Sequence, residues 1–404
     1  MHCGPIILAV QQIFLWPWLL RACWEREVTV SDRPTPVGAL LRAAPPDRLP
    51  EVVADHLRRH YAAGRVEALL GDLAMTSLWP LLEPDGPAGN ALAVRCFGSQ
   101  RPLVDANRAY LPLTVWGERL GVLVVETSLP PGSGLTGELS AVADELAVAL
   151  RAADQVTDRY RRVARRERLT MAAELQWELL PGRSLGDRRF LVAGQLEPAY
   201  AVYGDHFDWT VTGDRLTLTV LNGHGAGLDA AVLTAVAVNA MRNARRSGSD
   251  IVEQAELASD ALHARYGGAA HAATLLLEID LVGGQVAAVD AGSPRAVIAR
   301  ERGIHTVNLE QQLPLGMFGE TRYEIQRFRL EPADRLLVVS DGVHAASPRG
   351  RVPYGETALL TALRRTRLQP ATEAVGTVMR GLRDYHAGED PDDDAVTVCL
   401  DWRR

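Results

Sequence analysis

The spacing of apolar residues predicts a first region that mixes helices and strands. Residues 46–65 carry apolar side chains at helical spacing on one side only, which indicates an amphipathic helix. The apolar run 91–97 predicts a strand. Residues 110–115 and 120–126 flank a glycine-containing turn and predict a hairpin. A break rich in Pro and Gly then precedes a further helical pattern over 136–150.

A helical pattern resumes at residue 153 and ends at Pro181-Gly182. Its apolar positions suit a short two-stranded coil. The basic run 161–168 within it is of the kind that usually forms a solvated helix face. We therefore expect residues 151–182 to be a helical linker between two domains and to contribute to the seam of a homodimer.

From Phe190 onward the pattern changes to strands separated by turns. Leu216, Leu218 and Val220 alternate with threonines, which is the period of a strand with one core-facing side. Further strands are predicted at 273–280, 285–292, 323–330, 334–340 and 395–401, and helices at 229–246, 251–266, 356–367 and 372–386. Strands that arrive in runs, with helices in pairs, indicate antiparallel sheets covered by helices rather than a doubly wound parallel sheet.

These patterns predict an α+β protein with four segments. They are an extension over 1–35 that we expect to be disordered, an N-terminal α/β domain over 36–150, the helical linker over 151–182, and a C-terminal domain over 183–404. The apolar stretch within the extension, residues 5–20, is too short and too interrupted to span a bilayer.

Composition narrows the classes of function. The chain has 43 Lys and Arg residues, 50 Asp and Glu residues and a net charge of −7, so no overall positive field favours nucleic acid or an anionic membrane as a partner. Every one of the 43 is an arginine, which excludes P-loop phosphoryl transfer and Schiff-base chemistry because both need a lysine. The four cysteines show no CxxC spacing, which fits a reducing cytoplasm, and we expect a cytoplasmic protein.

Isolated aspartates stand at the ends of predicted strands in the C-terminal domain. Asp205 ends a strand in VYGDHFD, Asp341 ends LLVVSDG, and Asp393 and Asp394 directly precede AVTVCL. Each of these residues alone would more often belong to a turn. Together, carboxylates at strand ends can collect at one edge of a sandwich, where they offer the hard oxygen ligands that Mg²⁺ or Mn²⁺ prefers.

Seven short motifs, in this order, resemble the bacterial SpoIIE-type branch of the protein phosphatase 2C (PPM) family over about residues 165–402. The motifs are AAELQWELLP from Ala172, YGDHFDW from Tyr203, LNGHGAGLDAA from Leu221, VDAGSP from Val289, LPLGMF from Leu313, LEPADRLLVVSDGVHAA from Leu330 and DDAVTV from Asp393. The resemblance implies an α-β-β-α sandwich, in which two antiparallel sheets are flanked by helix pairs. It also implies a serine/threonine protein phosphatase in which two ions, Mn²⁺ or Mg²⁺, activate water for direct attack on the phosphate ester.

The resemblance assigns roles to particular positions. Asp205, Asp341 and Asp393 fall on metal-ligand carboxylates, and the backbone carbonyl of Gly223 falls on a main-chain metal contact. Asp394 replaces Asp393 in that role if the last motif shifts by one residue. In addition, Asp208 matches a recurrent acidic position for which we expect a structural or supporting role.

Asn222 stands where the family has the carboxylate that bridges both metal ions. An amide offers one neutral oxygen, so binding of at least one ion should weaken. An alternative alignment places Val220 there, so neither register supplies the aspartate. Ser293 replaces the usual histidine of its motif, and His224 is expected to be a hydrogen-bonding loop residue. Three functions stay open. The first is an active phosphatase that tolerates the amide. The second is a degenerate pseudophosphatase that acts as a signalling or binding module, and the third is an interaction scaffold whose GAF-like half senses the signal.

The resemblance also suggests a partner. Family members of this architecture dephosphorylate anti-sigma-factor antagonist proteins, so a phosphorylated protein of that kind is the implied substrate. The order of elements over 36–150 resembles a small GAF-type sensory domain, with a purely dimerising module as the alternative. The N-terminal domain and the linker are then expected to regulate the phosphatase by changing the geometry of a homodimer.

Overall fold

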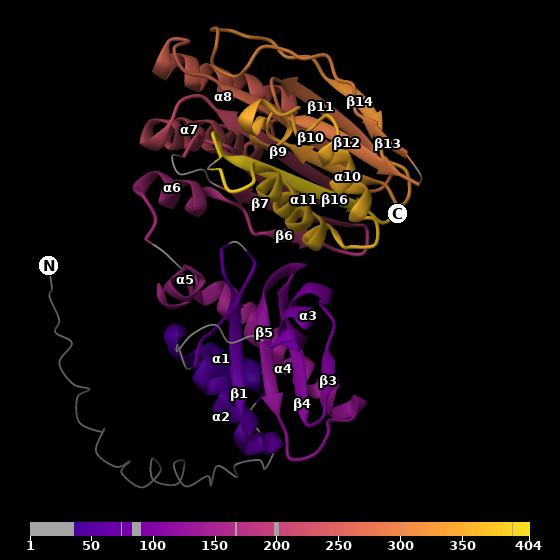
Figure 1. The fold of residues 1–404 in the computed structure, drawn as a ribbon. Coiled ribbons are helices and arrows are strands. Elements are labelled where there is room, and N and C mark those ends of the chain that lie inside the picture. Colours follow the sequence, from indigo (N-terminus) through magenta and orange to yellow (C-terminus); the bar gives the residue numbers. More distant parts are fainter. Residues whose placement is uncertain are drawn as a thin grey trace, which may run out of the picture.

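The computed structural model describes residues 36–73, 75–82, 90–165, 168–197, 202–301, 303–389 and 391–404. These residues form two α+β domains, drawn one above the other in Figure 1, with the C-terminus in the upper domain. The predicted disordered extension, residues 1–35, lies outside the described residues. Within the described ranges, no helix has the length and apolar character needed to cross a membrane.

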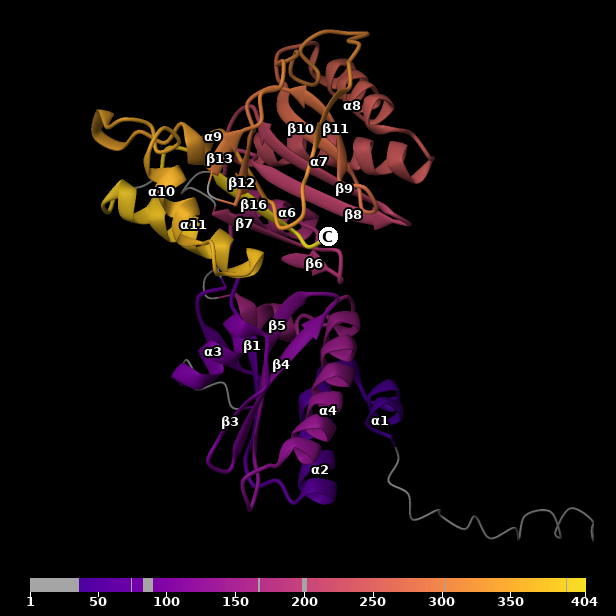
Figure 2. The same cartoon turned by 90° about the vertical axis from the view of Figure 1, so that its right-hand side faces the viewer.

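The N-terminal domain is a five-stranded antiparallel sheet with helices on both faces. The strands lie in the order β2-β1-β5-β4-β3. Helices α1, α2 and α4 share a core with one face, and α3 packs on the other face with a smaller cluster around Phe97 (Figure 2). The elements are α1 (Val37–Ala43), α2 (Leu49–Tyr61), β1 (Val66–Gly71), β2 (Leu78–Pro80), α3 (Ala91–Ser99), β3 (Leu103–Asp105), β4 (Arg108–Val115), β5 (Glu118–Glu126) and α4 (Ser133–Ala153).

The prediction of a strand over residues 91–97 is wrong, because this segment forms helix α3. Asn90 caps the helix by accepting a hydrogen bond from the backbone N–H of Ala93. The buried side chains of Ala93, Cys96 and Phe97 follow the i, i+3, i+4 spacing of a helix face. The predicted hairpin is confirmed by the antiparallel pairing of β4 with β5.

The linker is helical in two short pieces rather than as one continuous helix. They are α5 (Arg159–Ala164) and α6 (Met171–Leu179). Tyr160 is buried in the core of the N-terminal domain, and Arg159 forms a bidentate ion pair with Glu51 of α2. The first part of the linker is therefore packed on its own N-terminal domain, and α6 packs on α7 of the C-terminal domain.

The C-terminal domain is the predicted α-β-β-α sandwich. One sheet has the order β14-β11-β10-β9-β8 and is covered by α7 and α8, and the other has the order β13-β12-β15-β16-β7-β6 and is covered by α10 and α11 (Figure 2). The strands are β6 (Ser184–Gly186), β7 (Phe190–Glu197), β8 (His206–Thr212), β9 (Arg215–Gly223), β10 (Ala272–Asp280), β11 (Gln285–Ala291), β12 (Arg295–Arg300), β13 (Gly303–Thr306), β14 (Gln326–Arg329), β15 (Arg335–Val339) and β16 (Ala395–Trp402). The helices are α7 (Gly227–Arg246), α8 (Ile251–Tyr266), α9 (Asp341–His344), α10 (Ala358–Arg365) and α11 (Ala371–His386).

Local sequence explains these elements. The predicted alternation in β9 is confirmed, because Leu216, Leu218 and Val220 point into the core between the two sheets. Asp250 caps α8 by accepting hydrogen bonds from two backbone N–H groups of its first turn. Each helix pair covers the outer face of one sheet, which leaves the ends of the strands open at the edges of the sandwich.

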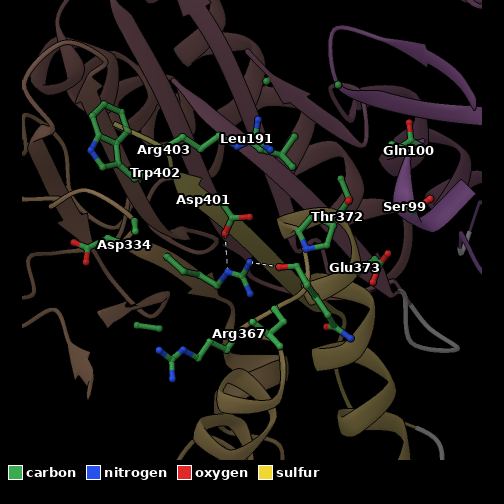
Figure 3. A pocket seen from close by; sticks show the side chains of 18 of the residues that line it. Ser99, Gln100, Leu191, Asp334, Arg367, Thr372, Glu373, Asp401, Trp402 and Arg403 are labelled. Atoms are coloured by element: carbon green, nitrogen blue, oxygen red, sulfur yellow. Dashed lines mark hydrogen bonds and ion pairs between the residues drawn. The ribbon is translucent and has the colours of Figure 1, made fainter. Parts of the chain in front are cut away.

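The tip of the β4–β5 hairpin docks on the C-terminal domain. The backbone N–H of Gly186 donates to Trp116, and Ser184 donates to the carbonyl of Gly117. Beside this contact a groove of about 1890 Å³ separates the two domains. In Figure 3, the N-terminal domain lines this groove with Ser99 and Gln100. The C-terminal domain lines it with Thr372, Glu373, Asp401 and Trp402.

Candidate metal centre

The predicted metal-ligand residues gather at one edge of the sandwich. Asp205 lies directly before β8, Asn222 and Gly223 end β9, Asp341 follows β15, and Asp393 lies just before β16. The two sheets contribute two groups each, β8 and β9 from one and β15 and β16 from the other. The sandwich therefore joins segments separated by almost two hundred residues of sequence.

The ionisation of two carboxylates of this edge, Asp205 and Asp393, is perturbed by burial and by neighbouring charges. Burial raises the pKa of Asp205 well above its usual range, and the charges of Asp393 and Asp341 raise it further. Burial, followed by the charge of Asp341, raises the pKa of Asp393 to about 7. Asp205 is only 1% exposed, so ionising the carboxyl groups of this edge is unfavourable unless an opposite charge lies beside them.

Asn222 and Ser293 are linked to Asp341 by hydrogen bonds. The amide Nδ2 of Asn222 donates to Ser293 Oγ at 2.9 Å, and Ser293 Oγ donates to Asp341 Oδ2 at 3.0 Å. This direction of donation turns the Oδ1 of Asn222 away, and that oxygen is buried without a hydrogen-bond partner among the described residues. The two departures from the family pattern, at 222 and 293, are thus partners in the folded protein.

Asp394 has a different environment from Asp393. Its Oδ2 accepts three hydrogen bonds, from Gln176 Nε2 at 2.9 Å and from the backbone N–H groups of Tyr203 at 2.8 Å and Gly204 at 3.0 Å. Gln176 also donates to the carbonyl of Asp205. Asp394 therefore holds the segment before β8 against α6 and the start of β16. Asp393 is instead the residue whose carboxyl pKa is raised.

Two glycines allow the backbones of the edge to approach closely. A Cβ on Gly342 would lie 1.8 Å from the carbonyl oxygen of Asp394. A Cβ on Gly223 would lie 2.8 Å from Thr234 Oγ1 and 3.0 Å from the carbonyl of Gly204. These contacts bring Asp341 close to the start of β16, and Gly223 close to the segment that carries Asp205.

The donor set suits a hard divalent cation. Asp205 Oδ2 and Asn222 Oδ1 are buried oxygens without a hydrogen-bond partner in the described ranges, and the neighbouring Asp341 and Asp393 carboxylates add oxygen donors. As the side chains lie, no three His, Cys, Asp or Glu residues of the described part are close enough together to coordinate one ion. The oxygens therefore fit the ion chemically but do not converge on one point, and Asp341 Oδ2 instead accepts a hydrogen bond from Ser293.

Other predicted residues lie around this edge. Asp208 is buried and ion-paired with Arg242 at 2.7 Å and Arg245 at 3.3 Å, so it ties β8 to α7. His224 lies in the glycine-rich turn after β9, and its ring stacks on His271 with centroids 4.8 Å apart. The sequence reasoning missed His271, although its place directly before β10, the strand that pairs with β9, was a usable signal.

Comparison with known proteins identifies the class of the C-terminal domain. Residues 212–403 match the family model described as Stage II sporulation protein E (SpoIIE). Together with the α-β-β-α sandwich, this match shows that the C-terminal domain is a PPM-type phosphatase domain of the SpoIIE type. No curated protein sequence matches the chain.

Several solved structures are similar to this chain at low sequence identity. The SiaA-PP2C domain of Pseudomonas aeruginosa is 20% identical with a TM-score of 0.50, and the match covers 57% of this chain and 94% of that one. A SpoIIE structure from Bacillus subtilis, with the PP2C domain and a regulatory fragment, is 20% identical with a TM-score of 0.46, covering 54% and 63%. The RsbU and RsbW domains of Rv1364c from Mycobacterium tuberculosis are 23% identical with a TM-score of 0.44, and the match spans 55% of this chain but only 62% of that protein.

Proposed function

We propose that the C-terminal domain is a metal-dependent phosphatase that hydrolyses phosphoserine or phosphothreonine on a regulatory protein of the anti-sigma-factor antagonist type. The observation that carries this proposal is the gathering of Asp205, Asp341 and Asp393 at one sandwich edge, in a domain that matches the SpoIIE family model. The class of substrate protein is supported by the resemblance of the sequence motifs.

In this proposal Mn²⁺ or Mg²⁺ is held by three carboxylates and two neutral oxygens. They are Asp205, Asp341, Asp393, Asn222 Oδ1 and the carbonyl of Gly223. Such a cation supplies charge neutralisation of the phosphate and lowers the pKa of water. Asp205 contributes an oxygen that is already desolvated and unpartnered, and Ser293 fixes the orientation of both Asn222 and Asp341. A bound cation would draw these oxygens together and compensate the negative charge that the carboxylates carry when ionised.

Whether the amide of Asn222 still permits metal binding distinguishes a working phosphatase from a pseudophosphatase. The neutral oxygen of this amide leaves the site one negative charge short of the family pattern, which weakens the second ion. Because Asn222 donates to Ser293, Asn222→Asp would remove that hydrogen bond and add a fourth carboxylate to the edge. We expect this variant to bind Mn²⁺ more tightly and to be less stable than the wild type when metal is absent, because its like charges are then uncompensated.

The test is Mn²⁺-dependent release of phosphate from p-nitrophenyl phosphate by the full chain. Wild type, Asn222→Asp and Asp341→Ala are compared, with Asp392→Ala as the control because Asp392 is an exposed residue of the same loop. Activity in the wild type and the control that is lost in Asp341→Ala supports the enzyme. A silent wild type with an active Asn222→Asp supports the pseudophosphatase instead.

We also propose that the N-terminal domain regulates this site through a homodimer. The docking of the β4–β5 hairpin against β6 supports a physical connection between the two halves. Deletion of residues 1–150 should change both the rate of phosphate release and the oligomer mass measured by light scattering. Unchanged values of both would contradict the regulatory role.

A further inference from the structure

A second, smaller cavity lies where the N-terminal domain, the linker and the start of the C-terminal domain meet. Its volume of about 370 Å³ is that of a small-molecule site. Leu70 and Arg119 line it from the N-terminal sheet, Arg151 and Tyr160 from α4 and α5, and Trp177 and Arg183 from α6 and the loop after it. The cavity is separate from the wider groove of Figure 3 and from the metal-site edge.

Five arginines line this cavity, and they fall into two groups. Three have carboxylate partners, since Arg151 pairs with Glu118 at 3.1 Å, Arg161 pairs with Asp154 and Glu178, and Arg165 pairs with Glu174. Arg119 and Arg183 form no such ion pair within the described part of the chain. The Nε of Arg119 and the Nη1 of Arg183 are buried atoms without a hydrogen-bond partner among the described residues.

Both of these guanidinium groups are desolvated and held in place. Arg119 is 9% exposed, donates through Nη2 to the carbonyl of Thr372 at 2.7 Å, and lies over the ring of Phe97. Arg183 stacks on Trp177 with its guanidinium carbon 4.6 Å from the ring centroid. Burial lowers the pKa of each to about 10, and Arg119 contributes to the lowering at Arg183.

Glu373 acts on Arg119 through its charge, and Asp72 and Glu118 act on Arg183, but none of these carboxylates forms an ion pair with them in the described residues. Both oxygens of Asp72 accept hydrogen bonds from Thr76. Glu118 is also engaged elsewhere. Its Oε1 accepts a hydrogen bond from the backbone N–H of Arg183, and its Oε2 pairs with Arg151. Two buried cations that repel each other cost free energy unless an anion reaches them. Their unpartnered N–H groups supply donors of the kind that bind carboxylate and phosphate oxygens.

We propose that this cavity binds a small oxyanion ligand, a molecule with a carboxylate or phosphate group, through Arg119 Nε and Arg183 Nη1. Because Arg119 belongs to the N-terminal domain and Arg183 begins the C-terminal domain, the ligand contacts both. The proposal is independent of the phosphatase function, since it uses none of the residues of the metal-site edge.

Thermal unfolding of the full chain tests the proposal. The protein is freed of divalent metals on a chelating resin, and its melting temperature is followed against orthophosphate and, separately, succinate, with chloride at matched ionic strength. A saturable rise with either oxyanion supports the site by linkage. A rise in melting temperature with phosphate alone indicates a phosphate-bearing ligand. A rise with succinate alone indicates a carboxylate-bearing ligand. No rise beyond that of chloride overturns the proposal.

The variant Arg183→Met makes the test specific. It removes one unpaired cation and keeps the apolar stem on Trp177, so its ligand-free melting temperature should not fall. Its affinity for the oxyanion should drop by roughly tenfold or more, about 1.4 kcal/mol. The control is Arg165→Met, which lines the same cavity but is already paired with Glu174, and it should keep the shift. Retention of the full shift by Arg183→Met also overturns the proposal.

Discussion

At the scale of single residues, Asp393 and Asp394 show how neighbouring carboxylates acquire opposite roles. Asp394 accepts three N–H groups through one oxygen, whereas Asp393 faces the charge of Asp341. We expect Asp394→Asn to lower the free energy of unfolding by about 2–3 kcal/mol, because hydrogen bonds to a charged group are lost. Asp393→Asn should keep that stability and lose Mn²⁺-dependent activity.

Urea unfolding and phosphate release, measured on the same preparations, separate the two residues. Equal loss of stability in both variants would contradict the division of roles.

Asp290 gives a second prediction at this scale. It is 8% exposed, and burial raises its pKa from 3.8 to about 6. Because the folded protein then binds more protons than the unfolded chain, stability falls as pH rises from about 4 to 6. Asp290→Asn keeps the acceptor for the N–H of Gly292 and removes the charge. It should raise the free energy of unfolding at pH 7.5 by up to about 3 kcal/mol.

Denaturant unfolding of both proteins between pH 4 and 8 checks this expectation. The two stability curves should meet near pH 4 and separate above it. Curves that run parallel across the whole range would show that Asp290 carries no such penalty.

At the scale of elements, the close contact between α9 and the start of β16 fixes the distance between Asp341 and Asp393. A Cβ at residue 342 would overlap the carbonyl of Asp394. Gly342→Ala should therefore force these elements apart, destabilise the protein by about 1–3 kcal/mol and reduce phosphatase activity. Gly137→Ala in α4 is the matched control, since nothing lies within 4 Å of its Cβ. That control should gain roughly 0.5–1 kcal/mol, and a harmless Gly342→Ala would refute the assignment.

The sequence patterns predicted elements best where the period was long and unbroken. Helix α8 was predicted over 251–266, and the structure confirms these limits, with Asp250 capping its start and Gly267 following its end. Residues 91–97 were predicted wrongly because a short apolar run fits a strand as well as a helix, whereas Asn90 before it caps a helix in the structure. The hydrogen bonds from Asn222 through Ser293 to Asp341 could not be predicted, because they join the end of β9, the β11–β12 turn and the start of α9, whose proximity no local pattern encodes.

At the scale of the whole molecule, one carboxylate connects the two domains. Glu118, at the start of β5, accepts from the backbone N–H of Arg183 and sits beside the hairpin tip that bonds to Gly186. We expect Glu118→Ala to speed hydrogen exchange at the amides of Arg183 and Gly186, because local opening between the domains becomes easier. Glu126→Ala, at the other end of the same strand and paired with Arg108, should leave both amides protected. Unchanged exchange in Glu118→Ala would contradict this connection.

The order of strands in the larger sheet of the C-terminal domain has a consequence for synthesis on the ribosome. β16 is translated after every other strand of its sheet, yet it pairs with β15 on one side and β7 on the other. Until it emerges, the nascent sheet exists as two fragments with open edges, which are exposed to mispairing and need protection. Asp393 emerges just ahead of β16, so the proposed metal site would be completed only when nearly all of the domain has been made.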